Sequence, residues 1–137
     1  MIEPAAAGRL LKRAQYRNHL AADRALATVG TTLAQWDALR AISESTGSSA
    51  HDLAIVTFQS DQAFGALANR LEAQKLIERS PGRGRRVEHA LTEDGRQIFE
   101  AGLKVTLEVS KMSFAMLTSI EVAQLHDLLD RVGEVPD

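Results

Sequence analysis

Apolar residues recur at steps of three and four in the first part of the stretch from Ser60 to Thr92, and this period predicts a helix with one buried face. The residues on that face are Phe64, Leu67, Ala68 and Leu71. Directly after the helix come a short run at 76–79, a glycine- and arginine-rich tip at 81–86, and a run at 87–91 that alternates in polarity. A helix followed by a hairpin with a basic tip suits a molecule that places the helix in one groove of DNA and the hairpin beside it.

Helix-forming residues fill the chain before this stretch. From about residue 5 to residue 29 it is rich in Ala, Leu, Arg and Lys, and Gly30 is a natural stop. Thr32 is placed to cap a second helix, with Gln35 reaching back from the third helical position in a capping box. One face of that second helix carries Trp36, Leu39, Ile42 and Ser43. We therefore expect a long first helix and a second helix that ends before Thr46.

A similar capping pattern opens a helix-turn-helix unit. Ser49 is followed three residues later by Asp52, and this spacing predicts a short third helix. The apolar residues of that helix are Leu53, Ala54 and Val56. The turn at 57–59 leads to Ser60, which is a suitable N-cap for the fourth helix. Two short helices joined by about three residues form a helix-turn-helix.

Two more helices are predicted after the hairpin. Thr92 provides a hydroxyl cap, and Glu93 and Asp94 place carboxylates at the positive end of a fifth helix that continues to about Leu117. A sixth helix begins near Ser119. The apolar residues are Ile98, Leu103, Leu107 and Met112 in the fifth helix and Val122, Leu125, Leu128, Leu129 and Val132 in the sixth. The expected fold is mainly α with a small β-hairpin.

Charge is distributed unevenly along the chain. Its 137 residues suit one compact domain, and a net charge of −2 argues against a non-specific binder of polyanions. Arg79, Arg83, Arg85 and Arg86 fall within eight residues that hold no acid, whereas from Thr92 onward nine Asp or Glu oppose four Lys or Arg. This polarity would turn the basic hairpin toward a phosphate backbone. The alternative is that the arginines only keep an exposed hairpin edge soluble.

Several classes of site are not expected. The chain has no cysteine, which excludes disulfides, thiolate zinc sites and thiol-based sensing. The four histidines, His19, His51, His89 and His126, lack the spacing of a zinc motif, and there is no nucleophile elbow, P-loop or convincing carboxylate pair. We therefore expect neither an enzyme nor a metal or cofactor site. The N-terminus has no long apolar run, so neither a signal peptide nor a membrane span is predicted and a cytoplasmic protein is expected.

The order of these elements resembles that of the MarR family of winged helix-turn-helix regulators. The segments that carry the resemblance are 32–36, 52–54, 69–72, 76–79, 84–86 and 91–95, and with the flanking helices they cover nearly the whole chain. The resemblance implies a homodimer in which the first, fifth and sixth helices of both subunits interlock. It divides the chain into a dimerisation helix at 1–30, a winged helix-turn-helix unit at 31–92 and dimerisation helices at 93–137. The apolar stripes of the terminal helices favour a dimer independently, although they could instead pack within one monomer.

The resemblance also implies how DNA would be bound. The fourth helix would enter the major groove, and Arg85 would enter the neighbouring minor groove, where negative potential attracts a guanidinium group. Arg83 and Arg86 would contact phosphate. The residues expected at the DNA are Ser60, Asp61, Gln62, Ala63, Ala66, Arg70, Arg83, Arg85 and Arg86. A dimer would contact two half-sites about one helical turn apart, so the operator should be an approximate palindrome, and repression is the commoner action of the family.

Two features depart from the family's pattern. Members commonly carry an acid at the position of Arg83, so Arg85 lacks that local partner here. Early in the fourth helix only Gln62 and Asp61 can hydrogen-bond to base edges, and Gly65 either permits a close approach or is simply tolerated. The alternative function is a dimeric winged-helix protein-interaction module that has lost sequence-specific DNA reading. A gel shift against the upstream region of its own gene separates the two.

Members of the family commonly bind small phenolic or otherwise lipophilic anions in a crevice between the dimer helices and the DNA-reading unit. The candidate residues for contact with such an effector are Tyr16, Arg17, His19, Trp36, Arg40, Met112 and Met116. Tryptophan at a helix start and methionines at four-residue spacing are also common in a hydrophobic core, so the sequence leaves both interpretations open.

Overall fold

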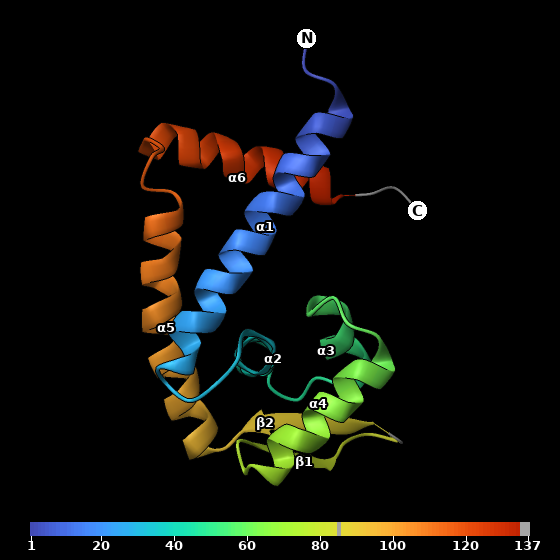
Figure 1. Ribbon diagram of the computed structural model, residues 1–137. Helices are drawn as coiled ribbons and strands as arrows, with labels where there is room; N and C mark the ends of the chain where they lie inside the picture. Colours follow the sequence, from blue (N-terminus) through green and yellow to red (C-terminus); the bar gives the residue numbers. More distant parts are fainter. Residues whose placement is uncertain (85, 135–137) are drawn as a thin grey trace.

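The computed structural model describes residues 1–84 and 86–134 of the chain (Figure 1). Its elements are α1 (Pro4–Ala27), α2 (Leu33–Glu44), α3 (Ala50–Val56), α4 (Asp61–Ala73), β1 (Ile77–Pro81), β2 (Val87–Leu91), α5 (Glu93–Ser113) and α6 (Ser119–Gly133). The two strands form an antiparallel hairpin in which Ile77 pairs with Leu91 and Pro81 pairs with Val87. The prediction of a mainly α fold with a small β-hairpin is confirmed.

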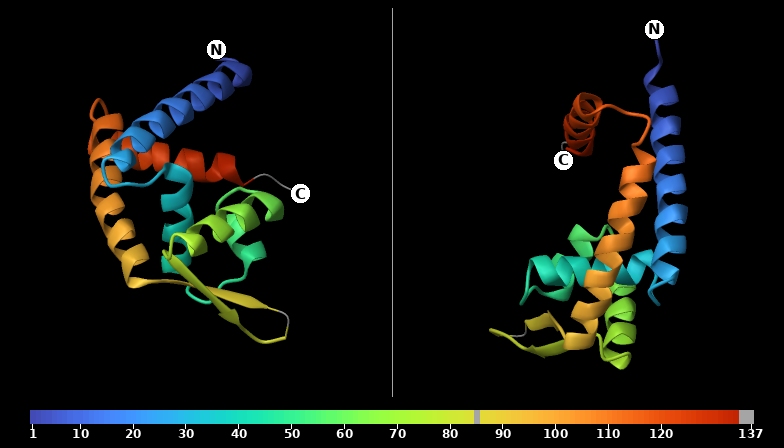
Figure 2. Two further views of the ribbon diagram at one scale, coloured as in Figure 1. Left: turned by 60° about the horizontal axis from the view of Figure 1, so that its bottom comes forward. Right: turned by 90° about the vertical axis from the view of Figure 1, so that its left-hand side faces the viewer.

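The elements form two parts (Figures 1 and 2). The helices α1 and α5 lie side by side, and α6 leaves the far end of α5 at a steep angle. At the other end of α5, the short helices α2, α3 and α4 pack together with the hairpin. No helix among the described residues is both long enough and apolar enough to cross a membrane.

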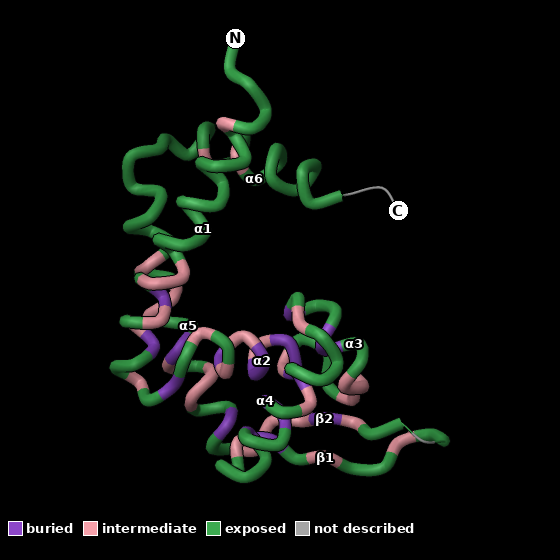
Figure 3. The backbone as a smooth tube through the Cα atoms, turned by 45° about the vertical axis from the view of Figure 1, so that its right-hand side comes forward, coloured by how far each residue is buried: buried purple, intermediate pink, exposed green. Residues whose placement is uncertain are grey.

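The hydrophobic core lies in the part formed by α2, α3, α4 and the hairpin (Figure 3). Its largest fully buried apolar side chains include Leu39, Ile42, Leu53, Phe64, Leu71 and Ile77. All four residues that the sequence predicted for the buried face of α4 belong to this core. Full burial of a Leu, Ile or Phe side chain stabilises a fold by about 1.5–3 kcal/mol, so these contacts fix the orientation of α4.

The predicted N-caps of the later helices are confirmed. The side chains of Ser49, Ser60 and Thr92 each accept a hydrogen bond from the backbone N–H three residues on. Of the two hydrogen bonds in the capping box predicted for α2, only the first is present. Thr32 accepts from the N–H of Gln35, but the Gln35 side chain accepts from the hydroxyl of Thr31 instead of returning to Thr32. The Thr31 hydroxyl therefore replaces the backbone N–H of Thr32 as the donor to the Gln35 side-chain oxygen.

Some predicted helix limits and faces also need correction. The first helix ends at Ala27, before Gly30, which has φ 84°. The fifth ends at Ser113, short of Leu117, because the backbone of Phe114 leaves the helical conformation. Val56 is 51% exposed at the end of the short helix α3 and does not join the core. On α2 the small residues Ala38 and Ala41 are buried, whereas Ser43 is only half-buried.

His89 is a polar residue at the centre of this core. It is 1% exposed, its ring packs edge-on against Phe64, and its Nδ1 lies 2.9 Å from the carbonyl oxygen of Ser48. Because that oxygen can only accept, Nδ1 must carry the proton. No partner lies within hydrogen-bond distance of Nε2 among the described residues, so a second proton would be buried without an acceptor. Burial accordingly lowers the pKa of His89 below its usual range.

Acid should therefore destabilise the fold through His89. The unfolded chain exposes the ring and binds the proton more readily, so stability is complete above the ordinary histidine pKa of about 6.5 and falls below it, by at most about 1.4 kcal/mol per pH unit. In His89→Asn, the amide can donate to Ser48 without titrating. We expect lower stability than wild type at pH 7 but a smaller loss between pH 7 and pH 5, measured by urea unfolding. An equal loss in both proteins would contradict this role.

The part of the structure farthest from the core is unusually exposed. No residue of α6 is buried, and the first half of α1 is exposed almost throughout (Figure 3). The exposed apolar side chains on these helices include Leu10, Leu11, Ile120, Leu128, Leu129 and Val132. An amphipathic helix whose apolar residues are all exposed or only half-buried requires a surface to cover it.

Candidate nucleic-acid interface

The helix α4 turns one face to the core and the opposite face to solvent. The exposed face carries five residues predicted for DNA contact: Asp61, Gln62, Ala63, Ala66 and Arg70. The hairpin lies beside α4 and projects beyond the body of the protein (Figure 2). A convex helix face and a protruding hairpin on one side can reach two adjacent grooves of a duplex.

Two polar contacts organise the first turn of α4. The Ser60 hydroxyl accepts from the N–H of Ala63 at 3.0 Å, and the Asp61 carboxylate lies 2.9 Å from Nδ1 of His51 on α3. The hydrogen bond with Asp61, together with its charge, raises the pKa of His51. Asp61, which was predicted to contact DNA, therefore also binds His51, a residue that the sequence did not predict at this interface. The side chain of Gln62 makes no hydrogen bond within the described part of the chain, which leaves its amide available to a base edge.

The tip of the hairpin is closed by its own backbone. The N–H of Gly82 donates to the carbonyl of Arg86 at 2.7 Å, and the N–H of Arg86 donates to the carbonyl of Arg83 at 3.2 Å. Gly84 has φ 65°, a left-handed conformation that favours glycine. Arg83 is exposed on this closed loop. Arg85, predicted for the minor groove, lies outside the described residues.

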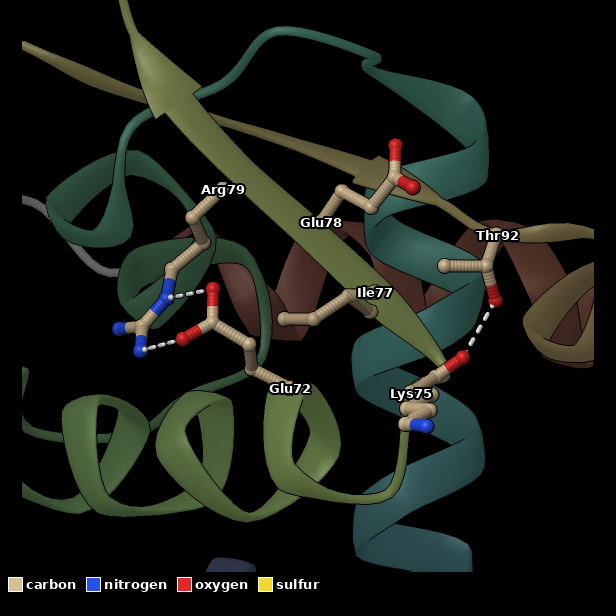
Figure 4. A pocket seen from close by; sticks show the side chains of 6 residues that line it. All are labelled: Glu72, Lys75, Ile77, Glu78, Arg79 and Thr92. Atoms are coloured by element: carbon tan, nitrogen blue, oxygen red, sulfur yellow. Dashed lines mark hydrogen bonds and ion pairs between the residues drawn. The ribbon is translucent and has the colours of Figure 1, made fainter.

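Arg79 is not part of the free basic tip, contrary to the grouping of four arginines drawn from the sequence. Its guanidinium group donates to both carboxylate oxygens of Glu72, at 3.1 and 2.8 Å (Figure 4). It also donates to the side-chain oxygen of Asn69 at 2.9 Å. The hydrogen bonds from Arg79 lower the pKa of Glu72. Arg79 and Glu72 also line a shallow pocket with Lys75 and Thr92. This bidentate pair ties the first strand to the end of α4, so Arg79 positions the hairpin.

Arg86 faces the start of α3. Its Nη2 lies 3.4 Å from the carboxylate of Asp52 and 3.4 Å from the carbonyl oxygen of Gly47. The side chains of Arg86 and Asp52 are 47% and 54% exposed, and an ion pair this exposed contributes about 0–1 kcal/mol. Arg86 can therefore leave Asp52 for a phosphate at little cost.

This arrangement recurs in known proteins. Residues 29–86 match the family model described as MarR family. The structure is similar to that of a mutant MarR from E. coli in complex with operator DNA, with a TM-score of 0.85 and 25% identity over 91% of each chain. The chain therefore matches the MarR family in the sequence of residues 29–86 and in its fold. No curated protein matches it closely enough to be informative.

Two further solved structures are similar over most of their length. A probable transcriptional regulator from Pseudomonas aeruginosa has a TM-score of 0.82 and 29% identity, over 91% of this chain and 95% of the other. BpsR of Bordetella bronchiseptica, whose DNA binding is regulated by 6-hydroxynicotinic acid, has a TM-score of 0.87 and 25% identity, over 94% and 99%. MarR-family proteins are transcriptional regulators, not enzymes.

The MarR fold places the seven candidate effector residues in different surroundings. Of the seven, Trp36 lines a cavity between α1, α2 and α5. Its ring stacks on Phe99 with centroids 6.0 Å apart, and its Nε1 donates to the Phe99 carbonyl at 3.1 Å. Trp36 therefore serves both as a packed core residue and as a wall of the cavity.

The other six candidates are not among the described lining of that cavity. Arg40 donates to Asp37 at 2.8 Å and to Glu44 at 2.9 Å, so its charge is already paired. His19 is half-buried on α1. The remaining candidates are exposed in this chain: Tyr16, Arg17, Met112 and Met116.

Proposed function

We propose that the protein is a sequence-specific DNA-binding transcriptional regulator that acts as a homodimer. The observation that carries this proposal is the exposed face of α4 beside a protruding basic hairpin, held together by Arg79 and Glu72. The E. coli MarR relative was crystallised with operator DNA, which supports the same use of this surface here. The DNA contacts proposed are Ser60, Asp61, Gln62, Ala63, Ala66, Arg70, Arg83, Arg85 and Arg86.

The exposed apolar faces of the terminal helices support the homodimer. Because α6 buries no residue in the single chain, a second copy is the simplest cover for residues such as Leu128 and Val132. We assign dimerisation to segments 1–30 and 93–137 and DNA reading to 31–92. The two α4 helices of such a dimer would lie about one helical turn of DNA apart, over a pseudo-palindromic operator.

We further propose that the protein is a repressor and that a small lipophilic or phenolic molecule releases it from DNA. The regulation of BpsR by 6-hydroxynicotinic acid supports the effector, and the cavity between α1, α2 and α5 gives it a place to bind. An effector changes DNA affinity only if it binds one state of the dimer more tightly than the other.

Two single substitutions should weaken DNA binding in different ways. We expect Arg85→Ala to lower affinity for operator and random duplex alike, by about tenfold, because a groove-inserted guanidinium group mainly senses groove potential. We expect Gln62→Ala to reduce the preference for operator by about tenfold while affinity for random duplex changes little. Fluorescence-anisotropy titrations of both duplexes at several salt concentrations measure these effects.

Lys104→Ala is the matched control, since it removes an exposed positive charge from α5, a helix assigned to dimerisation and not to DNA reading. We expect it to leave both affinities and the salt slope unchanged. An unchanged affinity for Arg85→Ala would remove the hairpin from the mechanism. An unchanged preference for Gln62→Ala would remove this residue from sequence reading.

A further inference from the structure

The first turn of α3 lies between the two elements proposed to contact DNA. On one side, Nδ1 of His51 lies 2.9 Å from Oδ1 of Asp61, the first residue of α4. On the other side, the Asp52 carboxylate lies 3.4 Å from Nη2 of Arg86 in the hairpin tip. The side chains of His51 and Asp61 are 67% and 69% exposed. His51 therefore borders the surface that α4 and the hairpin would present to a duplex, and a phosphate can reach it.

The hydrogen bond to Asp61 determines which nitrogen of His51 carries a proton. An ionised carboxylate can only accept, so Nδ1 of His51 is the donor. The opposite nitrogen, Nε2, makes no hydrogen bond with the described residues and forms the free edge of the ring. In the neutral ring this nitrogen is an acceptor, and in the imidazolium it is a donor.

A DNA phosphate can use only the charged form of this ring. Phosphate oxygens accept hydrogen bonds, so a neutral His51 would turn a lone pair toward them. The imidazolium would instead donate from Nε2 and add a favourable charge. Contact between His51 and phosphate therefore requires the ring to bind a second proton.

The Asp61 carboxylate and the His51 imidazolium depend on each other at this surface. A lone carboxylate that faces phosphate weakens binding through like-charge repulsion, and a protonated His51 offsets its charge. In return, the hydrogen bond with Asp61 and the charge of Asp61 raise the pKa of His51, and the charge of Asp52 contributes less. The same pair therefore favours the protonated ring before DNA arrives.

Among the described groups around α3, His51 is the one that titrates near pH 7. The helix packs against α4, α2 and β2. Besides Asp61, the charged or titratable residues of these elements are Arg70 and Glu72 on α4, Asp37, Arg40 and Glu44 on α2, and Glu88 and His89 on β2. Arginine and carboxylate side chains ordinarily titrate far from pH 7. His89 is buried with a lowered pKa, so it is already neutral where His51 still loses its proton.

We propose that His51 is a DNA-contact residue that binds a backbone phosphate as an imidazolium held by Asp61, so that each subunit takes up a proton when it binds DNA. The proposal rests on the proposed function, since it adds a contact to the same surface. Because the complex holds the proton more tightly than the free protein, affinity for DNA rises as the pH falls. The gain is lost as the pH rises through the pKa of His51 in the complex.

A mixed-sequence duplex of about 30 base pairs tests this contact, because a phosphate contact does not depend on sequence. We expect the affinity of the wild type to fall at least about tenfold from pH 6 to pH 8, measured by fluorescence anisotropy at constant ionic strength. In His51→Gln the amide can donate a hydrogen bond but does not titrate. We expect this variant to bind equally at both pH values, with an affinity close to that of the wild type at pH 8.

Two results would overturn the proposal: an affinity of the wild type that does not change with pH, or the same change in His51→Gln. Circular dichroism at pH 6 and pH 8 shows whether each protein is folded, so that a loss of binding is not confused with a loss of structure.

His126→Gln is the matched control, because α6 carries a similar pair. Nδ1 of His126 lies 3.0 Å from Oδ1 of Asp127, and the two side chains are 77% and 79% exposed. The hydrogen bond with Asp127 raises the pKa of His126 as well, but this pair lies on a helix assigned to dimerisation. We expect the variant to keep the pH dependence of the wild type. Loss of that dependence would place the linked proton at His126 and end the assignment to His51.

Asp61→Asn tests whether Asp61 holds the ring. Asparagine keeps an oxygen that can accept from Nδ1 of His51 but removes the charge, so the pKa of His51 should fall. We expect the midpoint of the pH dependence to move to lower pH, and the proton NMR signal of the His51 ring to titrate at lower pH in the free protein. An unchanged midpoint would exclude Asp61 from this role.

Isothermal titration calorimetry in two buffers of different ionisation enthalpy counts the protons directly. At pH 7 we expect proton uptake by the wild type on binding the duplex and none by His51→Gln. Tight binding by the wild type without proton uptake would end this proposal and leave the regulator proposal intact. A wild type that binds no duplex at pH 6 or pH 8 in low salt would contradict the regulator proposal itself.

Discussion

Gly95→Ala should leave little folded protein at 25 °C. A Cβ at this position would overlap the carbonyl oxygen of Leu76 and come within 2.9 Å of its carbonyl carbon. Both partners are backbone, so no side chain can rotate away. The same carbonyl accepts a hydrogen bond from the N–H of Thr92 at 3.1 Å. Moving the carbonyl would break this bond, which connects the residue before β1 to the N-cap of α5. We expect a loss on the order of 4 kcal/mol or more, comparable with the whole stability of a small domain.

Gly65→Ala is the matched control, because no atom lies within 4 Å of the position its Cβ would take among the described residues. Its glycine stands inside α4, where alanine is favoured by about 1 kcal/mol, so the control should become more stable. Urea unfolding followed by circular dichroism measures both variants. A midpoint for Gly95→Ala close to that of wild type would show that the contact with Leu76 is not fixed.

Gly102→Ala should be the second most damaging single substitution. Its Cβ would overlap Cδ1 and Nε1 of the Trp36 indole and lie 3.0 Å from a methyl carbon of Leu26. The indole is 7% exposed and held by its hydrogen bond to Phe99, so it has little room to shift. Overpacking of this kind costs about 1–3 kcal/mol, and losing the indole hydrogen bond adds about 1 kcal/mol.

A double-mutant cycle tests this cause of the damage. In a Trp36→Phe background the smaller ring leaves space for the added methyl group, so Gly102→Ala should cost at least about 1 kcal/mol less than it does in wild type. Unfolding of the four proteins in urea, followed by circular dichroism, gives the coupling. Additive effects would mean that Trp36 is not what Gly102 accommodates.

The helices were predictable where local signals were strong. The buried face of α4, with Phe64 and Leu71 at its ends, follows from apolar spacing alone, and the serine and threonine caps follow from backbone groups that must be paired. The partner of the Gln35 side chain was not predictable, since both the backbone N–H of Thr32 and the hydroxyl of the neighbouring Thr31 can donate to its oxygen. Which of them wins depends on the path of the chain after α1.

Interactions between distant segments could not be predicted from sequence. Arg79 stood in a basic run, yet it pairs with Glu72 because the hairpin folds back over the end of α4. His51 reaches Asp61 only once α3 and α4 are packed. The need for a small residue at Gly102 follows only from the contact between the Trp36 indole and α5. The positions of the DNA-contact candidates along α4, by contrast, follow from helical periodicity once the buried face is known.

Selection of bound duplexes from a random pool tests the central claim most directly, because it reports specificity, symmetry and spacing together. A homodimer that seats two α4 helices in the major groove should enrich an inverted repeat whose half-sites lie about one helical turn apart. Recovery of a pool no different from the starting mixture at low salt, or of sites without symmetry, would contradict it.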